Sequence, residues 1–167
     1  MPARRPPTLP ELEERMRSIH ARLRRRKTTV AVAESCTGGL LAAVLTAHGG
    51  SSDYFNGGAV VYSNEAKTTL ADVAPDLIHG HGAVSAVVAG ALARGARHRL
   101  GAKIGLGITG IAGPGGATPG KPVGLVFVAV DSDEHSAVKK NQWPFDREGN
   151  RLASVGVALD LLEDAIA

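Results

Sequence analysis

Two segments of the chain, one near each end, carry apolar residues at helical spacing. The first is predicted as a helix over residues 8–26, where apolar positions recur at intervals of four and three residues. Thr8 and Glu11 form a capping-box pattern at the start of this helix. The second segment is predicted as a helix that begins at residue 147. The apolar faces consist of Leu12, Met16, Ile19 and Leu23 in the first helix, and of Leu152, Val155, Leu159 and Leu162 in the second. Both helices are therefore expected to pack one face against a core.

Between these helices, apolar runs alternate with shorter helical segments. The predicted strands are residues 28–33, 58–63, 103–108, 123–130 and 137–143. The predicted helices are 38–46, 64–71 with Asn64 as cap, and 85–100 with Ser85 as cap, while 48–58 is predicted as a loop. Strands interleaved with helices favour an α/β fold, and apolar runs without alternation favour a sheet covered on both faces.

The pattern also predicts the domain organisation. The last two predicted strands have no helix between them, so a mixed sheet is expected rather than a purely parallel one. We therefore predict a single-domain three-layer α/β/α sandwich with a mixed sheet. Residues 1–7 are expected to form a flexible tail and residues 8–167 the domain.

Composition narrows the class of protein. The chain has 167 residues, of which 44% are hydrophobic, enough for one domain with a sizeable core. A single cysteine excludes an internal disulfide and favours a reducing compartment. No stretch reaches the roughly 18 apolar residues of a membrane span, and no signal peptide is recognisable. We expect a cytoplasmic protein without a membrane partner.

Charge is distributed unevenly along the chain. Residues 1–27 carry nine Lys and Arg against three Glu, whereas the remaining residues carry ten basic and thirteen acidic side chains. A basic segment of this kind is compatible with nucleic-acid binding or with an ordinary solvated helix face. Because no aromatic residues interleave with the basic ones, the helix face is favoured and no nucleic-acid partner is expected.

A polar turn interrupts two apolar runs at residues 34–39, with the sequence Glu-Ser-Cys-Thr-Gly-Gly. Ser35 would follow the carboxyl end of a strand and precede a helix, where ligands gather in open α/β sheets. The amides that follow it, which lack helical partners and attract anions, are those of Cys36, Thr37, Gly38 and Gly39. Three interpretations stay open: a nucleophile with its oxyanion site, a phosphate site, or a simple helix cap.

The segment VVYSNEAKTTL, residues 60–70, contains a candidate base for Ser35. Lys67 would serve as a base only if burial lowers its pKa, because desolvation penalises the ammonium form. The hydroxyl of Tyr62 would relay or hold the proton between the serine and the lysine. By position alone, the favoured interpretation is a solvated helix residue for Lys67 and a strand-end aromatic for Tyr62.

A glycine-rich loop, TGIAGPGGATPGKP, lies between two predicted strands at residues 109–122. It holds five glycines and three prolines, and its amides are suited to an anion-binding nest to which Thr109 adds a hydroxyl. It is not a P-loop, because no Gly-Lys-Ser/Thr ends it. The alternative is a long connection without a binding role.

Other chemistry is not indicated. His79 and His81 flank a glycine but have no neighbouring cysteine or second histidine pair, so no metal site is predicted. Cys36 is a rival nucleophile next to Ser35, yet no particular histidine is implicated as its partner, and a packing role is predicted.

Five ordered blocks resemble those of the CinA carboxy-terminal domain family. They are AESCTGGLLAA, GGAVVYSNEAKTTL, HGAVS, GITGIAGPGG and KPVG, and the resemblance spans about residues 10–165. Characterised members are nicotinamide-nucleotide amidases, which hydrolyse the carboxamide of nicotinamide mononucleotide (NMN) to nicotinate mononucleotide and ammonia. The resemblance implies this activity within pyridine-nucleotide recycling, with NMN as substrate and no metal or organic cofactor. We also expect a homo-oligomer, with a dimer favoured.

The resemblance also assigns residue roles. Ser35 matches the family's nucleophile, and Tyr62 with Lys67 matches the residues that help to activate it. The residues then expected to contact substrate are Cys36, Thr37, Gly38, Gly39, Thr109, Gly110, Gly113, Gly115, Gly116 and Arg147.

The chain departs from its relatives in two ways. Many relatives carry a separate amino-terminal domain linked to pyrophosphatase activity, whereas a short basic helix precedes the domain here, so that activity is not expected. Relatives also tend to have Gly-Asp-Arg before the last helix, where this chain has Phe145-Asp146-Arg147. The rival hypothesis is a non-catalytic nucleotide-binding or regulatory module with the same pocket. The joint presence of Ser35, Tyr62 and Lys67 favours the enzyme.

Overall fold

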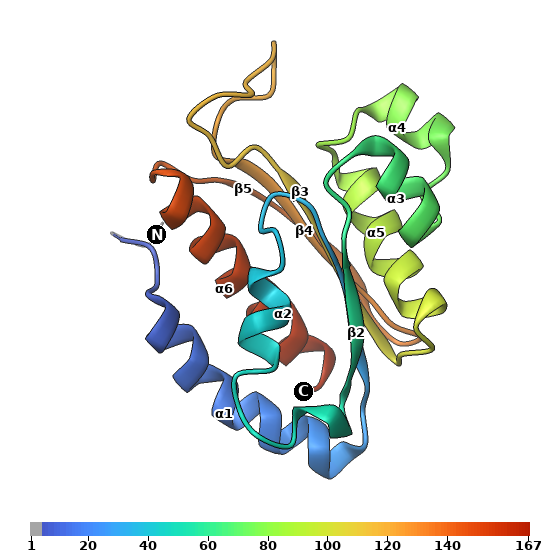
Figure 1. The fold of residues 1–167 in the computed structure, drawn as a ribbon, viewed down its shortest axis with the longest axis vertical. Helices are drawn as coiled ribbons and strands as arrows, with labels where there is room; N and C mark the ends of the chain where they lie inside the picture. The colour runs from blue at the N-terminus through green and yellow to red at the C-terminus, as the bar shows by residue number, and fades with distance from the viewer. Residues whose placement is uncertain (1–4) are drawn as a thin grey trace.

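The computed structural model describes residues 5–167 and contains one five-stranded sheet between two layers of helices (Figure 1). The strands are β1 (Val30–Glu34), β2 (Phe55–Val60), β3 (Ile104–Gly110), β4 (Leu125–Asp131) and β5 (Ser136–Gln142). Their spatial order is β2-β1-β3-β4-β5. The first three are mutually parallel, whereas β4 and β5 run antiparallel to their neighbours. The predicted mixed sheet is confirmed.

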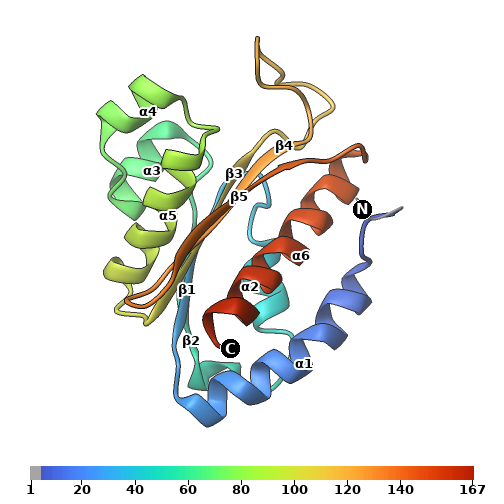
Figure 2. The ribbon, with the colours of Figure 1, turned by 180° about the vertical axis from the view of Figure 1, so that it is seen from behind.

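Helices cover both faces of this sheet. They are α1 (Leu9–Arg26), α2 (Leu40–Leu45), α3 (Asn64–Ala71), α4 (Pro75–His81), α5 (Ala86–Arg99) and α6 (Arg147–Ala165). Figures 1 and 2 show α1, α2 and α6 on one face and α3, α4 and α5 on the other, which confirms the three-layer α/β/α sandwich. Within residues 5–167, none of the helices combines the length and apolar character that a membrane crossing requires.

The first periodic segment folds as its pattern predicts, and in the second Val155, Leu159 and Leu162 are buried while Leu152 is partly buried. Helix α1 begins with a complete capping box between Thr8 and Glu11. Its buried residues are Leu12, Met16, Ile19 and Leu23, the four apolar positions of the sequence pattern. Residues 1–4 of the predicted tail lie outside the described residues, and Arg5 forms an ion pair with Glu11.

Close backbone packing explains a core with few aromatic residues. Helix α5 lies so near β3 that a Cβ at Gly107 would be 2.5 Å from the carbonyl oxygen of Ala89. A Cβ at Gly105 would likewise meet the carbonyl oxygen of Ala93. Glycine at these two strand positions therefore allows the helix to approach the sheet directly.

Several predicted boundaries are wrong, each for a local reason. Helix α2 starts at Leu40 rather than residue 38, because Gly38 and Gly39 have φ of 60° and 102°, outside the right-handed helical region. Strand β2 starts at Phe55, inside the predicted loop, and the same loop contains a 3₁₀ turn, Ser51–Asp53.

The helices after β2 also differ from the prediction. Ser63 caps α3, since its side chain accepts a hydrogen bond from the Ala66 amide, and Asn64 is the first helical residue. Helix α4 was not predicted. It has seven residues, and Pro75 at its start and Gly82 after its end are the helix signals in its sequence. Only Ile78 is buried and no side chain caps the first turn, so the segment has no apolar period.

The parallel strands bring the predicted polar segments to one edge of the sheet. Glu34 at the end of β1 lies opposite Val60 of β2 and Ile108 of β3. The chain leaves this edge into the Ser35 turn, into the segment before α3 and into the glycine-rich loop. This edge is where a site built from these segments would lie.

Candidate active site

A cavity of about 290 Å³ opens at this edge of the sheet. Its volume is close to the lower end of the roughly 300–1,000 Å³ of ligand pockets. Its lining comprises Ser35, Cys36, Tyr62, Asn64, Lys67, Ala83, Val84, Thr109, Gly110, Ile111, Ala112, Gly113, Gly115, Gly116 and Arg147. The structure therefore brings the serine, the lysine and the glycine-rich loop together around one space.

Ser35 and Lys67 are in direct contact. The Lys67 ammonium group donates to Ser35 Oγ at 3.2 Å and to the backbone oxygens of Val61 at 2.9 Å and Tyr62 at 3.4 Å. Lys67 is 2% exposed and Ser35 is 8% exposed. Burial lowers the pKa of Lys67 below its ordinary value, since desolvation penalises the charged form. The position of Lys67 and its lowered pKa thus both suit it to exchange a proton with the Ser35 hydroxyl.

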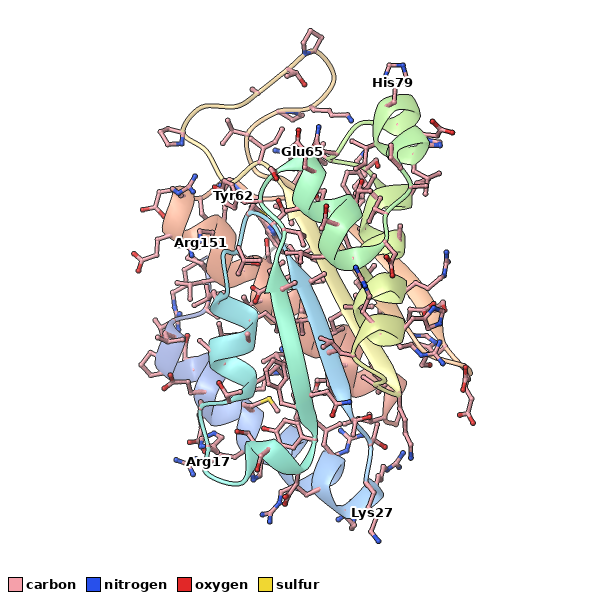
Figure 3. All side chains as sticks on the ribbon, turned by 45° about the vertical axis from the view of Figure 1, so that its right-hand side comes forward. Arg17, Lys27, Tyr62, Glu65, His79 and Arg151 are labelled. Atoms are coloured by element: carbon pink, nitrogen blue, oxygen red, sulfur yellow. The ribbon has the colours of Figure 1, made fainter. Side chains whose placement is uncertain are left out.

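The hydroxyl of Tyr62 does not lie between these two groups. It accepts a hydrogen bond from Arg147 Nη2 at 3.0 Å, and Tyr62 is exposed. The proposed proton relay through this hydroxyl is therefore wrong in this conformation, because Lys67 contacts Ser35 without an intermediary. Figure 3 shows Tyr62 and Arg151 in the upper half of the molecule, with Arg17 and Lys27 near its lower end.

Part of the Ser35 turn is already occupied by a buried carboxylate. Glu34 accepts hydrogen bonds from the amides of Leu41 and Ala42, at 2.8 and 3.0 Å, so this side chain satisfies the first turn of α2. The Gly38 amide donates to the Ser35 carbonyl oxygen at 3.1 Å. An external anion is thus not expected at the start of α2, in contrast to the sequence prediction.

Three residues predicted to contact substrate lie outside the cavity lining. They are Thr37, Gly38 and Gly39. Thr37 is fully buried, and the two glycines make the left-handed turn before α2. Within residues 5–167 the Cys36 amide has no hydrogen-bond partner, and Cys36 lines the cavity. The Thr37 and Gly39 amides also have no partner among the described residues, but neither residue lines the cavity. The Cys36 amide, directly after Ser35, is therefore the amide of this turn that is placed to donate to an oxyanion in the cavity.

The glycine-rich loop forms the opposite wall. The loop residues that line the cavity are Gly110, Ile111, Ala112, Gly113, Gly115 and Gly116. Among the described residues, the amides of Gly113, Gly115 and Gly116 have no partner. Thr109 donates its hydroxyl proton to the carbonyl oxygen of Ala83 at 2.7 Å, so this hydroxyl can only accept from a ligand. The wall offers several amide donors suited to an anion.

Arg147, the first residue of α6, closes the cavity beside this loop. Its guanidinium group donates to the Gly113 carbonyl oxygen at 2.8 Å and to the Tyr62 hydroxyl. The cation is thus fixed in the cavity lining by the loop and by the segment after β2. Replacement of the family's glycine by Phe145 does not remove Arg147 from the cavity.

Cys36 is not suited to act as the nucleophile. Burial raises the pKa of its thiol to about 12, so the thiol is protonated at neutral pH. Among residues 5–167, no cluster of three or more His, Cys, Asp or Glu side chains is arranged to hold a metal ion.

Sequence reasoning missed three residues at this site. Glu34 is 1% exposed and caps α2, Asn64 lines the cavity, and Arg151 donates to the Thr37 carbonyl oxygen at 2.9 Å. A charged residue at the end of a buried strand was a usable signal for Glu34. Arg151 follows Arg147 by four residues on α6, so both lie on the same side of the helix.

Comparison with known proteins gives concordant matches. The model of the family described as the CinA C-terminal domain matches residues 12–166. A CinA-like protein from Koribacter versatilis is 56% identical over 140 residues, covering 84% of this chain and 34% of the relative. A CinA-like protein from Mycolicibacterium gilvum is 52% identical over 140 residues, covering 83% of this chain and 33% of the relative. The chain thus spans about a third of the length of the curated relatives it matches.

Solved structures share the fold at comparable length. The competence/damage inducible protein CihA from Agrobacterium tumefaciens superposes with a TM-score of 0.89 at 38% identity, covering 96% of each chain. A CinA superfamily protein from Escherichia coli superposes with a TM-score of 0.87 at 30% identity, covering 95% of this chain and 90% of that one.

Proposed function

Because the chain belongs to the CinA C-terminal domain family, we propose that it is an amidase that hydrolyses the carboxamide of NMN to nicotinate mononucleotide and ammonia. The observation that carries this proposal is the direct contact between a buried lysine and a buried serine, with 3.2 Å between Lys67 Nζ and Ser35 Oγ. A nucleotide-binding module has no need of this pair, whereas acyl transfer requires a nucleophile with a base.

The three hydrogen-bond partners of Lys67 accommodate both of its protonation states. As an ammonium ion, its three N–H groups can donate to Ser35 Oγ and to the carbonyl oxygens of Val61 and Tyr62. As a neutral amine, it needs two N–H groups for the two carbonyl oxygens. The lone pair then faces the Ser35 hydroxyl, which is the arrangement required for proton transfer.

The proposed reaction starts when Ser35 Oγ attacks the carbonyl carbon of the carboxamide. Its proton passes to Lys67, and the Cys36 amide donates to the oxyanion of the tetrahedral intermediate. Collapse of this intermediate breaks the C–N bond, and Lys67 returns the proton to the departing nitrogen, which leaves as ammonia. Water then attacks the acyl-serine ester, Lys67 takes its proton, and the proton returns to Ser35 as nicotinate mononucleotide leaves.

The phosphate of NMN is proposed to lie between Arg147 and the glycine-rich loop. Arg147 supplies a cation in the cavity lining, and the Gly113, Gly115 and Gly116 amides supply unpaired donors. We assign to Tyr62 a supporting part, since its carbonyl oxygen holds Lys67 and its hydroxyl holds Arg147. Binding energy from a remote phosphate can raise turnover as well as affinity.

The proposal is tested by ammonia release from three substrates, namely NMN, nicotinamide riboside and free nicotinamide. We expect kcat/KM for NMN to exceed that for the two phosphate-free compounds by at least about 100-fold. Equal rates on all three would contradict the phosphate site. Tight binding of NMN without ammonia release would instead identify a non-catalytic nucleotide-binding module.

A further inference from the structure

The residue before Ser35 is a carboxylate buried without a cationic hydrogen-bond partner. Besides the two α2 amides, Glu34 accepts a hydrogen bond from the Thr37 hydroxyl at 2.7 Å. Its partners among the described residues are therefore neutral, and Glu34 takes part in no ion pair there. A buried carboxylate is costly to desolvate, but three donors and the positive end of a helix offset this cost.

Arg151 also holds this turn, through the backbone of Thr37. Its Nη2 donates to the Thr37 carbonyl oxygen, while its Nε is buried and has no partner within residues 5–167. Thr37 is thus hydrogen-bonded to Glu34 through its hydroxyl, and its carbonyl oxygen accepts from Arg151 and from the Leu40 amide.

These contacts enclose the two residues that the reaction uses. Ser35 and Cys36 lie between Glu34 and Thr37 in the chain, and the Gly38 amide closes the turn on the Ser35 carbonyl oxygen. With both ends of this segment fixed, the directions of the Ser35 hydroxyl and the Cys36 amide are fixed relative to each other. That relation sets the attack geometry, because both groups must act on the same carbonyl group.

Resting on the proposed function, we infer that Glu34 and Arg151 are positioning residues, which act through Thr37 to aim Ser35 and the Cys36 amide at one carbonyl group. Neither residue lines the cavity, and neither is hydrogen-bonded to Lys67. Their loss is therefore expected to reduce the rate of the chemical step, without changing the affinity for substrate or the ionisation of the base.

The test measures kcat, KM and the pH profile of ammonia release for Arg151→Met and Glu34→Gln. The second variant keeps the shape of the side chain but loses one acceptor of the carboxylate. We expect kcat to fall about 10–100-fold, as a displacement near 1 Å would cause, while KM changes by less than about threefold. The inflection of the pH profile should stay in place, and Arg151→Lys should recover part of the loss.

Arg22→Met is the matched control. Arg22 Nη2 also donates to a backbone carbonyl oxygen at 2.9 Å, that of Ile166, and Arg22 takes no part in the cavity lining. Removal of this bond should leave kcat unchanged. An Arg151→Met protein that is less stable than the wild type, yet has wild-type kcat well below its melting temperature, would overturn the inference.

A second readout separates this inference from the proposed function. The rate at which a fluorophosphonate probe labels Ser35, followed by intact mass, reports attack geometry without NMN. If the wild type is labelled but releases no ammonia from NMN, the amidase proposal fails, and slower labelling of Arg151→Met and Glu34→Gln still supports positioning. Labelling of both variants at the wild-type rate would contradict it.

Discussion

Lys67 is buried with an amine that has only neutral hydrogen-bond partners, Ser35 and two backbone carbonyl groups. A lysine that served solubility would be exposed, and one that served stability would be expected to meet a carboxylate. Desolvation without a compensating negative partner is the arrangement that lowers the pKa of an amine and makes its neutral form easier to populate. The environment of this residue is therefore the main physical argument for acyl transfer.

Substitution of Lys67 tests whether it acts as a base or only as a cation. Lys67→Met keeps the bulk of the stem and removes the amine, and should reduce kcat by about 10²–10⁴-fold, the usual contribution of general-base catalysis. Lys67→Arg should be nearly as damaging, because a guanidinium group does not deprotonate at neutral or mildly alkaline pH. Steady-state ammonia release measures both. Full activity of Lys67→Arg would show that this position supplies charge alone.

The pH dependence follows from the direction of the Lys67 pKa shift. Because burial lowers this pKa, the unfolded chain binds more protons here than the folded protein does. Lys67 therefore destabilises the folded state at low pH, and this effect diminishes as pH rises through the folded pKa toward the unfolded value. Activity should rise over the same ionisation, since the neutral amine is the base. A pH–rate profile that falls with increasing pH would assign the ionisation to another group.

At the scale of elements, the sequence predicts helices and strands best where buried residues follow a regular pattern. Helix α1 follows from four apolar residues and a capping box, and the central strands β1, β3 and β4 follow from runs of buried residues. Helix α4 escaped prediction because its one buried residue, Ile78, defines no period. The start of α2 was misplaced because two adjacent glycines adopt left-handed conformations, which glycine permits but does not require.

The site illustrates the same limit. Its segments were recognised as candidates from their positions after strands, yet Ser35 and Lys67 are 32 residues apart, and spacing alone cannot pair them. The relay through Tyr62 failed because the Arg147 guanidinium group, 85 residues away in the chain, is the hydrogen-bond partner of its hydroxyl. Such pairings depend on sheet order and helix packing, which a local pattern does not encode.

The position of Arg147 in the first turn of α6 leads to a separate prediction. Arg147→Met removes a cation from the cavity and releases the Gly113 carbonyl, and should raise KM for NMN about tenfold, or roughly 1.4 kcal/mol. Turnover at saturation should change less, and hydrolysis of nicotinamide riboside should not change, because that compound lacks the phosphate. An unchanged KM for NMN would place the phosphate elsewhere.

At the scale of the whole molecule, ion pairs with distant acidic residues neutralise part of the charge of the basic amino-terminal segment. Arg15 bridges Asp160 and Glu163 of α6, and Arg24 pairs with Asp53. Figure 2 shows α1 lying along α6 on the outer face of the molecule. These contacts bring acidic residues from distant parts of the chain onto the basic helix, so its net charge in the sequence overstates the charge presented to a partner.

We accordingly predict no binding of nucleic acid at physiological salt. Fluorescence anisotropy of a labelled duplex, titrated with protein at about 150 mM salt, should show no saturable change. Saturable binding that weakens steeply with added salt would show that α1 presents a free basic surface. The homo-oligomeric state, with a dimer favoured, stays a prediction from the sequence.

The measurement that tests the central claim most directly is ammonia release from NMN by the wild type, Ser35→Ala and Cys36→Ala, assayed together with NMN binding. The account predicts one nicotinate mononucleotide per ammonia for the wild type and most of that activity for Cys36→Ala. Ser35→Ala should show no turnover and bind NMN within about tenfold of the wild type. Undiminished ammonia release by Ser35→Ala, or loss of turnover in Cys36→Ala alone, would contradict the account.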